Sequence, residues 1–174
     1  DKRKPLVVLS TLGTTETCAV RVRVQLESKG YEVVVFHTVG SGGEAMDELI
    51  REHGVVAAVD LSLHELTDNR FGGDYNAGPD RGRAAMEKGI PTLLIPGNTD
   101  FIVTGTLKRA KEKFPGRTSH SHNTAITTIR TSGEELKAIG RVVGELCNQA
   151  RGPVEILIPQ KGLSAFDHPN GPMY

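Results

Sequence analysis

Two consecutive stretches of this chain read as a short apolar strand, a loop rich in glycine and threonine, and then a helix. They span residues 6–30, with the loop TLGTTE, and residues 32–54, with the loop HTVGSGG. A loop that opens directly into a helix aims free backbone N–H groups and the positive end of the helix dipole at one point. Such a point suits an anion, most commonly a phosphate. The pattern therefore predicts a phosphate or nucleotide site in an α/β protein.

Strand-like and helical patterns alternate along the chain. Apolar runs that predict buried strands occur at 5–10, 32–37, 55–61, 91–96 and 154–159, with a weaker one at 124–130. Helical patterns lie at 16–29, 43–53, 79–88 and 133–150. We therefore expect one Rossmann-like (flavodoxin-like) domain over 1–174, with three α/β/α layers around a mostly parallel sheet of five or six strands.

Local signals refine this outline. Pro79 is expected to be the first residue of its helix, and Ser132 with Glu135 forms a capping box for the last helix. The longest segments expected to be irregular are 69–78 and 97–123. Polar loops follow the predicted strands, among them SLHELTD, GNTDF and QKG. Because the carboxyl ends of parallel strands meet at one edge of a sheet, we expect a ligand site there.

The composition narrows the class of protein. Lys plus Arg equals Asp plus Glu, 21 of each in 174 residues, so no basic field indicates a nucleic-acid partner. No stretch approaches the roughly 18 apolar residues of a membrane span. Cys18 and Cys147 lie far apart without a CxxC spacing, which favours a reducing cytoplasm with both side chains buried. We expect a cytoplasmic protein.

The first loop offers Gly13, Thr14 and Thr15 to a ligand. Gly13 permits close backbone approach, and the threonine hydroxyls can donate hydrogen bonds. An equally weighted alternative is that Thr14 or Thr15 only caps the helix that follows. The loop lacks the spacing and the lysine of a P-loop.

The second loop is a glycine cluster made of Gly40, Ser41, Gly42 and Gly43. It is a partial match to GxGxxG, with Ala45 in the last position, and such a match is weak alone. We expect the cluster to hold phosphate oxygens, with the guanidinium of Arg81 or Arg130 neutralising their charge. The alternative is an ordinary helix start, with Glu44 favoured by the helix dipole.

Five side chains near the expected site are candidates for acid/base work: His37, Asp60, Glu65, Asp100 and His122. If 63–69 is helical, His64 and Asp68 lie on one face, where they could pair or bind a metal; an ordinary solvated helix face is the alternative. His120 and His122 share one side of an extended segment, which is compatible with zinc. Further ligands are not evident, so we predict no metal site.

Several long motifs occur in the order of one family. They are GYEVVVFHTVGSGGEAMDELI, DLSLHELTDNRFGG, AGPDRGRAAMEKGIPTLLIPGNTDF, SHNTAITTIRTSGEE and LIPQKGLSAFDHPNGPMY. Over almost its whole length the chain resembles the C-terminal half of the UPF0261, or Tm-1-like ATP-binding, family. The resemblance implies a Rossmann-like lobe that pairs with a preceding N-terminal lobe, an association with ATP, and a homo-oligomer. It implies no particular reaction.

Three functions follow as hypotheses. The first is a nucleotide-binding domain for ATP, with or without Mg²⁺, that forms half of a cytoplasmic ATP-dependent enzyme or regulator. The second is an enzyme that acts on a small phosphorylated or carboxylated metabolite through the acid/base residues named above. The third is a protein-interaction module, which the viral-resistance role of the family's plant member suggests. We expect no nucleic-acid or membrane partner.

Overall fold

Five parallel strands form the central sheet of the computed structural model, which describes residues 4–174. Their order is β2-β1-β3-β4-β8. The bounds are β1 (Leu6–Thr11), β2 (Glu32–His37), β3 (Val55–Ser62), β4 (Thr92–Gly97) and β8 (Val154–Ile156). The strand order reverses at β1, because β1 is followed by β2 on one side and β3 lies on its other side. In such a sheet the carboxyl edge at this switch point is where ligands bind.

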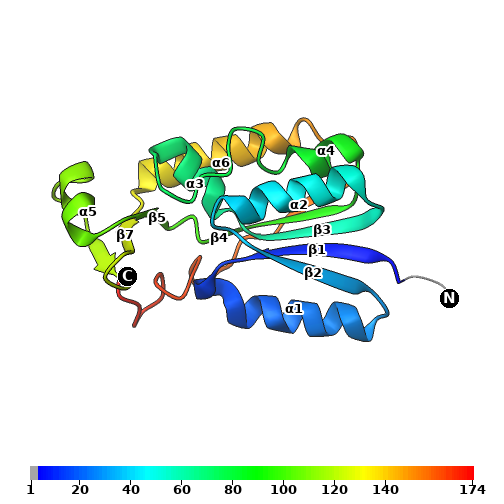
Figure 1. Ribbon diagram of the computed structural model, residues 1–174, viewed down its shortest axis with the longest axis horizontal. Coiled ribbons are helices and arrows are strands. Elements are labelled where there is room, and N and C mark those ends of the chain that lie inside the picture. The colour runs from blue at the N-terminus through cyan, green and yellow to red at the C-terminus, as the bar shows by residue number, and fades with distance from the viewer. Residues whose placement is uncertain (1–3) are drawn as a thin grey trace.

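Helices cover both faces of the sheet, which confirms the three-layer prediction. Helix α1 (Glu16–Ser28) lies on one face, and α2 (Ser41–Glu52), α4 (Arg83–Lys88) and α6 (Gly133–Cys147) lie on the other (Figure 1). The capping box of α6 is also confirmed: the Glu135 N–H donates to the Ser132 hydroxyl, and the Ser132 N–H donates to the Glu135 carboxylate.

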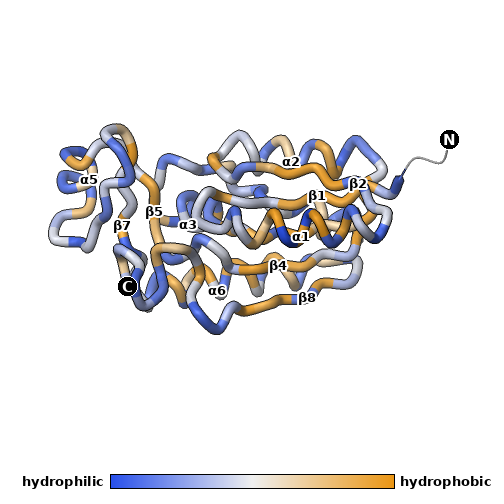
Figure 2. The backbone as a smooth tube through the Cα atoms, turned by 90° about the horizontal axis from the view of Figure 1, so that it is seen from below, coloured by the Kyte–Doolittle hydropathy of each residue, from blue (hydrophilic) through white to orange (hydrophobic). Residues whose placement is uncertain are grey.

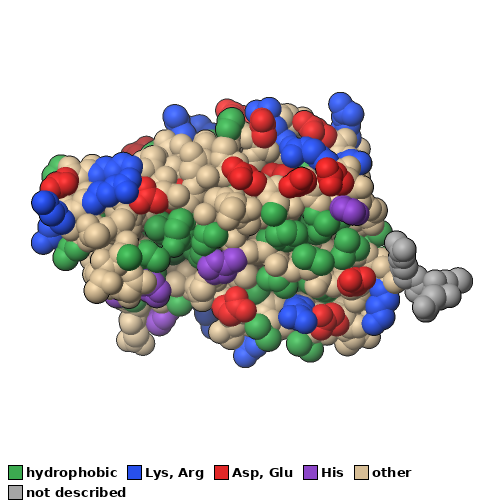
Figure 3. All heavy atoms as spheres, in the orientation of Figure 1, with side chains coloured by type: hydrophobic (Ala, Val, Ile, Leu, Met, Phe, Trp, Pro, Cys, Tyr) green, Lys and Arg blue, Asp and Glu red, His purple; other side chains and the backbone are tan. Residues whose placement is uncertain are grey.

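The two faces are packed unequally. The larger apolar core lies under α2, α4 and α6 and includes Val8, Ile50 and Leu94. The smaller one lies under α1, where Leu9 and Ile95 are buried. Strands β4 and β8 run beside α1 rather than beneath it (Figure 2). At the β2 edge of the sheet, apolar side chains form a band between the charged surfaces of the two helical layers (Figure 3).

A second, smaller sheet was not predicted. Strands β5 (Phe101–Thr104), β7 (Thr127–Arg130) and β6 (Ser119–Ser121) pair antiparallel in the order β5-β7-β6, beside α5 (Leu107–Lys113). The expectation that 97–123 is irregular is therefore wrong, and the weak strand at 124–130 belongs to this sheet. Strands of three or four residues are too short to show a periodic pattern.

Some helix boundaries also differ from the prediction. Helix α4 begins at Arg83 instead of Pro79, because Gly82 before it adopts a left-handed conformation with φ of 85°. A further helix, α3 (His64–Phe71), fulfils the condition placed on 63–69, but His64 and Asp68 are fully buried in it rather than solvated. Cys18 is exposed, contrary to the expectation that both cysteines are buried.

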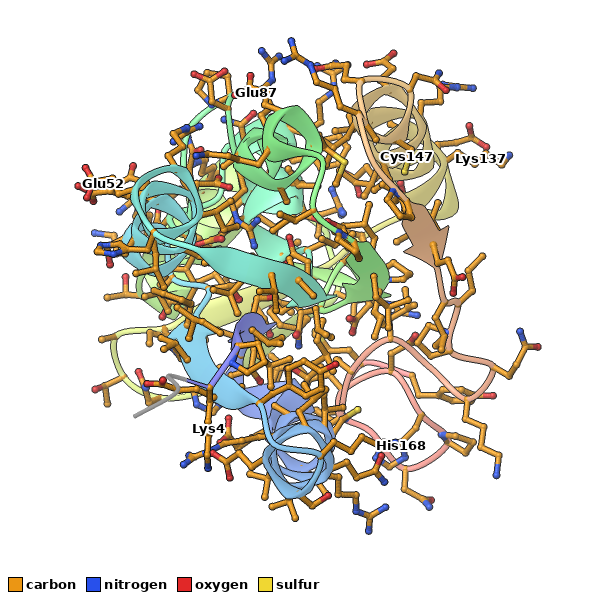
Figure 4. The ribbon with its side chains drawn as sticks, turned by 90° about the vertical axis from the view of Figure 1, so that its right-hand side faces the viewer. Lys4, Glu52, Glu87, Lys137, Cys147 and His168 are labelled. Atoms are coloured by element: carbon orange, nitrogen blue, oxygen red, sulfur yellow. The ribbon has the colours of Figure 1, made fainter. Side chains whose placement is uncertain are left out.

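The C-terminal segment, residues 157–174, contains no helix or strand. It carries His168 and lies on the same side of the sheet as α1, whereas α6, with Lys137 and Cys147, lies on the other side (Figure 4). Met173 is 2 % exposed and packs with Leu12, Phe101 and Val103. The segment is therefore anchored across the carboxyl edge of the sheet. Among the helices of residues 4–174, none is both long enough and apolar enough to cross a membrane.

Candidate functional site

Two cavities flank the loop that follows β1. The first, which we call the α1 cavity, has a volume of about 440 Å³ and lies at the start of α1. Its lining includes Gly13, Thr15, Glu16, Cys18 and Arg21, together with part of the C-terminal segment. A short 3-10 helix, η1 (Gly13–Thr15), precedes α1. The Thr15 hydroxyl accepts from the Leu12 N–H at 3.1 Å and so caps η1, but it makes no cap hydrogen bond to α1. The positive end of α1 thus faces a cavity that contains hydroxyl and guanidinium donors.

The second cavity, which we call the aromatic cavity, has a volume of about 360 Å³ and a mainly apolar lining. Its walls include the rings of Tyr75, Phe101 and Phe166. The imidazoles of His37 and His122 also line it, and both residues are exposed. A flat apolar group with a few polar atoms would suit this lining, because aromatic walls stack on planar rings and the imidazoles supply hydrogen bonds.

One wall separates the two cavities. Gly13, Thr14 and Ala165 line both of them. The Ala165 N–H donates to the Thr14 carbonyl at 3.0 Å, which ties the C-terminal segment to the loop at this point. The cavities are therefore neighbours that share one short piece of chain as a common wall.

The second glycine loop is occupied by the protein's own carboxylate. The backbone N–H groups of Gly40 and Gly43 donate to Glu65 Oε1 at 2.7 and 3.0 Å. Glu65 thus sits at the start of α2, in the place where a ligand anion was expected. Residues 40–43 line neither the α1 cavity nor the aromatic cavity, so the structure does not bring Ser41 and Gly42 to them either.

Arg81 completes a buried ion network with Glu65 and Asp60. Its Nε donates to Glu65 Oε2 at 2.6 Å, and its two Nη atoms donate to the two oxygens of Asp60 at 2.7 and 2.8 Å. Burial works against the charge on Arg81, but the adjacent carboxylates outweigh it and raise the pKa of the guanidinium. Burial raises the pKa of Glu65 despite the contact with Arg81. These three side chains satisfy one another and offer no free group to a ligand in either cavity.

Asp100 and Arg130 meet beneath the C-terminal segment. Asp100 is fully buried and accepts from the Ser164 hydroxyl at 2.6 Å. Arg130 pairs with Asp167 at 2.5 Å and lies 3.6 Å from Asp100. Burial raises the pKa of Asp100 to about 6. Both residues hold the segment that forms the outer wall of the cavities, and neither lines a cavity itself.

His64 and Asp68 form a second buried pair. His64 Nε2 lies 3.2 Å from Asp68 Oδ2, and Nδ1 contacts the carbonyl oxygen of Asn98 at 2.8 Å. Burial alone would lower the pKa of His64, but Asp68 and the carbonyl outweigh it and the pKa is raised. The ring also packs against Phe101, with centroids 4.8 Å apart. The pair therefore supports the aromatic cavity indirectly, because His64 packs against Phe101, which lines that cavity.

Sequence reasoning missed the aromatic walls. Tyr75, Phe101 and Phe166 come from three segments far apart in the chain, and no regular spacing connects them. The one sequence signal for these aromatic residues is that Tyr75 and Phe166 lie in polar segments, DYNAG and SAFDHP, like the other loops expected at the site. Within residues 4–174 no group of three or more His, Cys, Asp and Glu side chains is placed to hold a metal ion, so His120 and His122 do not form part of such a group.

The fold and the cavities define a parallel α/β domain with two neighbouring cavities at the carboxyl edge of its sheet, beside the topological switch point. Residues 4–174 match the model of the "Uncharacterised protein family (UPF0261) C-terminal domain". The chain belongs to the UPF0261 family, as the resemblance in sequence motifs indicated.

Known relatives extend beyond this chain. A UPF0261 protein of Clostridium tetani is 40% identical over 164 residues, which are 94% of this chain and 41% of that protein. A UPF0261 protein of Brucella suis is 33% identical over 98% of this chain and 41% of its own length. The ToMV resistance protein Tm-1 of Solanum lycopersicum is 33% identical over 97% of this chain and 22% of its own. The chain thus spans about two fifths of the length of these bacterial relatives.

Proposed function

We propose that this chain is a nucleotide-binding domain for ATP and works as part of a cytoplasmic ATP-dependent enzyme or regulator. The observation that carries the proposal is the pair of cavities that share Gly13 and Thr14 as a wall. One cavity suits a planar ring and the other suits an anion, and a nucleotide combines both. The resemblance to the Tm-1-like ATP-binding family selects ATP among nucleotides.

The base would occupy the aromatic cavity. Phe166 and Tyr75 present ring surface there, and His37 and His122 present imidazole nitrogens that can bond to polar atoms of a purine. The phosphates would lie in the α1 cavity, next to the Gly13 backbone and the Thr14 hydroxyl. We leave the buried network of Arg81 out of the proposed site, together with residues 40–43.

Charge in the α1 cavity is mixed. Arg21 lines it and can neutralise a phosphate, whereas Glu16 lines it with the opposite sign. An Mg²⁺ ion carried in with the nucleotide would offset the charge of Glu16, because carboxylate and phosphate oxygens are the ligands that Mg²⁺ prefers. We therefore propose that ATP binds with Mg²⁺.

Parts of the longer relatives supply the rest of the proposed function. Because this chain spans 41% of the bacterial relatives, we propose that an N-terminal lobe or another subunit works with this domain. From the family resemblance we also propose a homo-oligomer. A second candidate function is favoured by the two exposed imidazoles in one cavity: acid/base catalysis on a small phosphorylated or carboxylated metabolite by His37 and His122. In that case His122→Ala would abolish turnover while ligand binding persists.

The proposal is tested by a variant that separates the two cavities. Cys18 is exposed in the first turn of α1 and lines only the α1 cavity of the two, so Cys18→Glu adds a negative charge there without disturbing the core. We expect ATP to bind roughly tenfold more weakly to Cys18→Glu, with adenosine affinity unchanged, because only the phosphates meet the new charge. Isothermal titration measures both, and Cys18→Gln is the uncharged control. Equal binding of ATP to all three proteins would contradict the placement of the phosphates.

A further inference from the structure

Asn98 occupies an unusual position between the cavities and the protein core. Among residues 4–174 it is the one residue other than glycine with a positive φ, 62°, and its exposure is 0 %. Its backbone N–H donates to the Leu163 carbonyl at 2.9 Å, and its carbonyl oxygen contacts His64 Nδ1 at 2.8 Å. A left-handed conformation costs free energy in a residue with a side chain, so a fixed role for that side chain is expected.

The side chain of Asn98 contacts both threonines of the first loop. Its Oδ1 accepts from the Thr15 hydroxyl at 2.9 Å, and its Nδ2 donates to Thr14 Oγ1. Thr15 Oγ1 already accepts from the Leu12 N–H at 3.1 Å, so its own proton is available to Asn98. In this orientation the amide oxygen, which only accepts, faces Thr15, and the amide nitrogen, which only donates, faces Thr14.

The two threonines are thereby given different roles. The Thr15 hydroxyl has two acceptors for its proton, Asn98 Oδ1 at 2.9 Å and the Leu12 carbonyl at 3.0 Å. Thr14, in contrast, accepts from Asn98 and keeps its own proton free to donate. Thr14 is also the residue that lines both cavities. The loop therefore presents a free hydroxyl proton at the junction between the proposed base and phosphate positions.

We propose that Asn98 is a positioning residue that makes Thr14 a hydrogen-bond donor and so selects ligands that carry an anionic oxygen at this point. The ligand class is a phosphate ester, and the inference rests on the proposed nucleotide function. Asn98 touches no ligand itself; it acts through the hydroxyl of Thr14. A ligand that offers only a donor at the same point, such as an ammonium group in place of the phosphate, would have to share the Thr14 oxygen with the Asn98 amide.

A double-mutant cycle tests this inference, with ATP and adenosine as probes. Asn98→Gly keeps the positive φ and removes the amide, and Thr14→Val removes the hydroxyl at nearly constant shape. A hydrogen bond to a charged group is worth about 1.5–3 kcal/mol, so each variant should bind ATP at least tenfold more weakly. The double variant should be no weaker than Thr14→Val alone, and adenosine affinity should fall less than ATP affinity in each variant.

Two more variants separate positioning from a merely structural role. Asn98→Asp also tolerates a left-handed conformation, but its carboxylate would take the Thr14 proton and leave no donor for the ligand. We expect it to lose more ATP affinity than Asn98→Gly. Thr14→Ser keeps the hydroxyl and should restore most of the affinity lost in Thr14→Val. Thermal unfolding of every variant checks that the fold is retained.

The outcomes are distinguishable. Losses of ATP affinity that multiply in the double variant would overturn the inference, because Asn98 would then act independently of Thr14. Equal losses for ATP and adenosine in Asn98→Gly would overturn it too, since a general loosening of the site would explain them. If the unmodified chain binds ATP no better than adenosine, the proposed function fails, and this inference fails with it.

Discussion

At the scale of the residue, Asp100 is the side chain whose protonation most affects the carboxyl edge of the sheet. Burial raises its pKa to about 6, although the Ser164 hydroxyl and Arg130 act in the opposite direction. The folded state therefore binds this proton more tightly than the unfolded state does. The group adds stability as the pH falls from about 7 toward 4, and that contribution is lost as the pH rises through 6.

Asp100→Asn should remove this pH dependence. Between pH 7.5 and pH 4.5 the free energy of unfolding of the unmodified chain should rise by about 2 kcal/mol relative to the variant, because a shift of one pKa unit corresponds to about 1.4 kcal/mol. Urea unfolding at the two pH values measures the difference. Glu134→Gln, at a largely exposed position on α6, is the control and should show no such change. Parallel pH profiles for the unmodified chain and Asp100→Asn would contradict the role of Asp100.

Individual residues of the candidate site differ in how far the sequence predicts their surroundings. Gly13, Thr14 and His37 follow predicted strands, and His122 lies in a predicted extended segment; each of the four lines at least one of the two cavities. Nothing in the spacing of the second loop indicates that a carboxylate more than 20 residues later fills it. Contacts between distant segments decide whether a helix start is free, and a single sequence does not contain them.

At the scale of the element, the start of α2 is fixed by close packing as well as by Glu65. A Cβ atom added at Gly42 would lie 1.8 Å from the carbonyl oxygen of His37, which is backbone and cannot turn aside. In contrast, a Cβ added at Gly140, inside α6, meets nothing within 4 Å. Gly42 is therefore required, because no side chain fits between α2 and β2 at this position. Gly140 is not required, because the space around it would accept a methyl group.

Gly42→Ala and Gly140→Ala should therefore change stability in opposite directions. We expect Gly42→Ala to lower the free energy of unfolding by more than about 2 kcal/mol, because strand β2 or helix α2 must move. Gly140→Ala should raise it by about 0.5–1 kcal/mol, since alanine favours a helix interior over glycine. Chemical denaturation of both variants measures the pair. A destabilised Gly140→Ala or a neutral Gly42→Ala would contradict the packing described.

The parallel elements were predictable, and the small sheet was not. Strands such as VVLS and VVVF carry several apolar residues in succession, and each is followed by a helix with a clear start. Strands β5, β6 and β7 have four, three and four residues, so they contain too few positions for a pattern. Pairing between β5 and β7 across an intervening helix defines that sheet instead.

At the scale of the whole molecule, the C-terminal segment packs against the first loop, at the end of the molecule away from the N-terminus (Figure 1). Met173 is almost completely buried beside Leu12, and Phe166 packs on Phe101 with ring centroids 5.4 Å apart. The last residues therefore complete the core behind the first loop and supply the outer wall of both cavities. The packing of Met173 and Phe166 therefore contributes both to the stability of this part of the fold and to the shape of the two cavities.

Met173→Ala should weaken both properties. We expect a loss of about 2–4 kcal/mol in the free energy of unfolding, as is usual when a buried methionine is truncated. Amide exchange at Ala165 should become faster, because its hydrogen bond to the Thr14 carbonyl depends on the anchored segment. Tyr174→Ala is the control: the side chain is 79% exposed, and its removal should change stability by less than about 0.5 kcal/mol. An unchanged exchange rate in Met173→Ala would show that the segment is held elsewhere.

The central claim is that one nucleotide bridges the two cavities, and thermal unfolding of this chain with a ligand panel tests it most directly. The panel consists of ATP with and without Mg²⁺, adenosine and inorganic phosphate. A ligand present at 100 times its dissociation constant adds about 2.7 kcal/mol to the free energy of unfolding. We predict stabilisation by ATP, more with Mg²⁺, that exceeds the effects of adenosine and phosphate at the same concentration. An unfolding temperature that responds to none of them would contradict the claim.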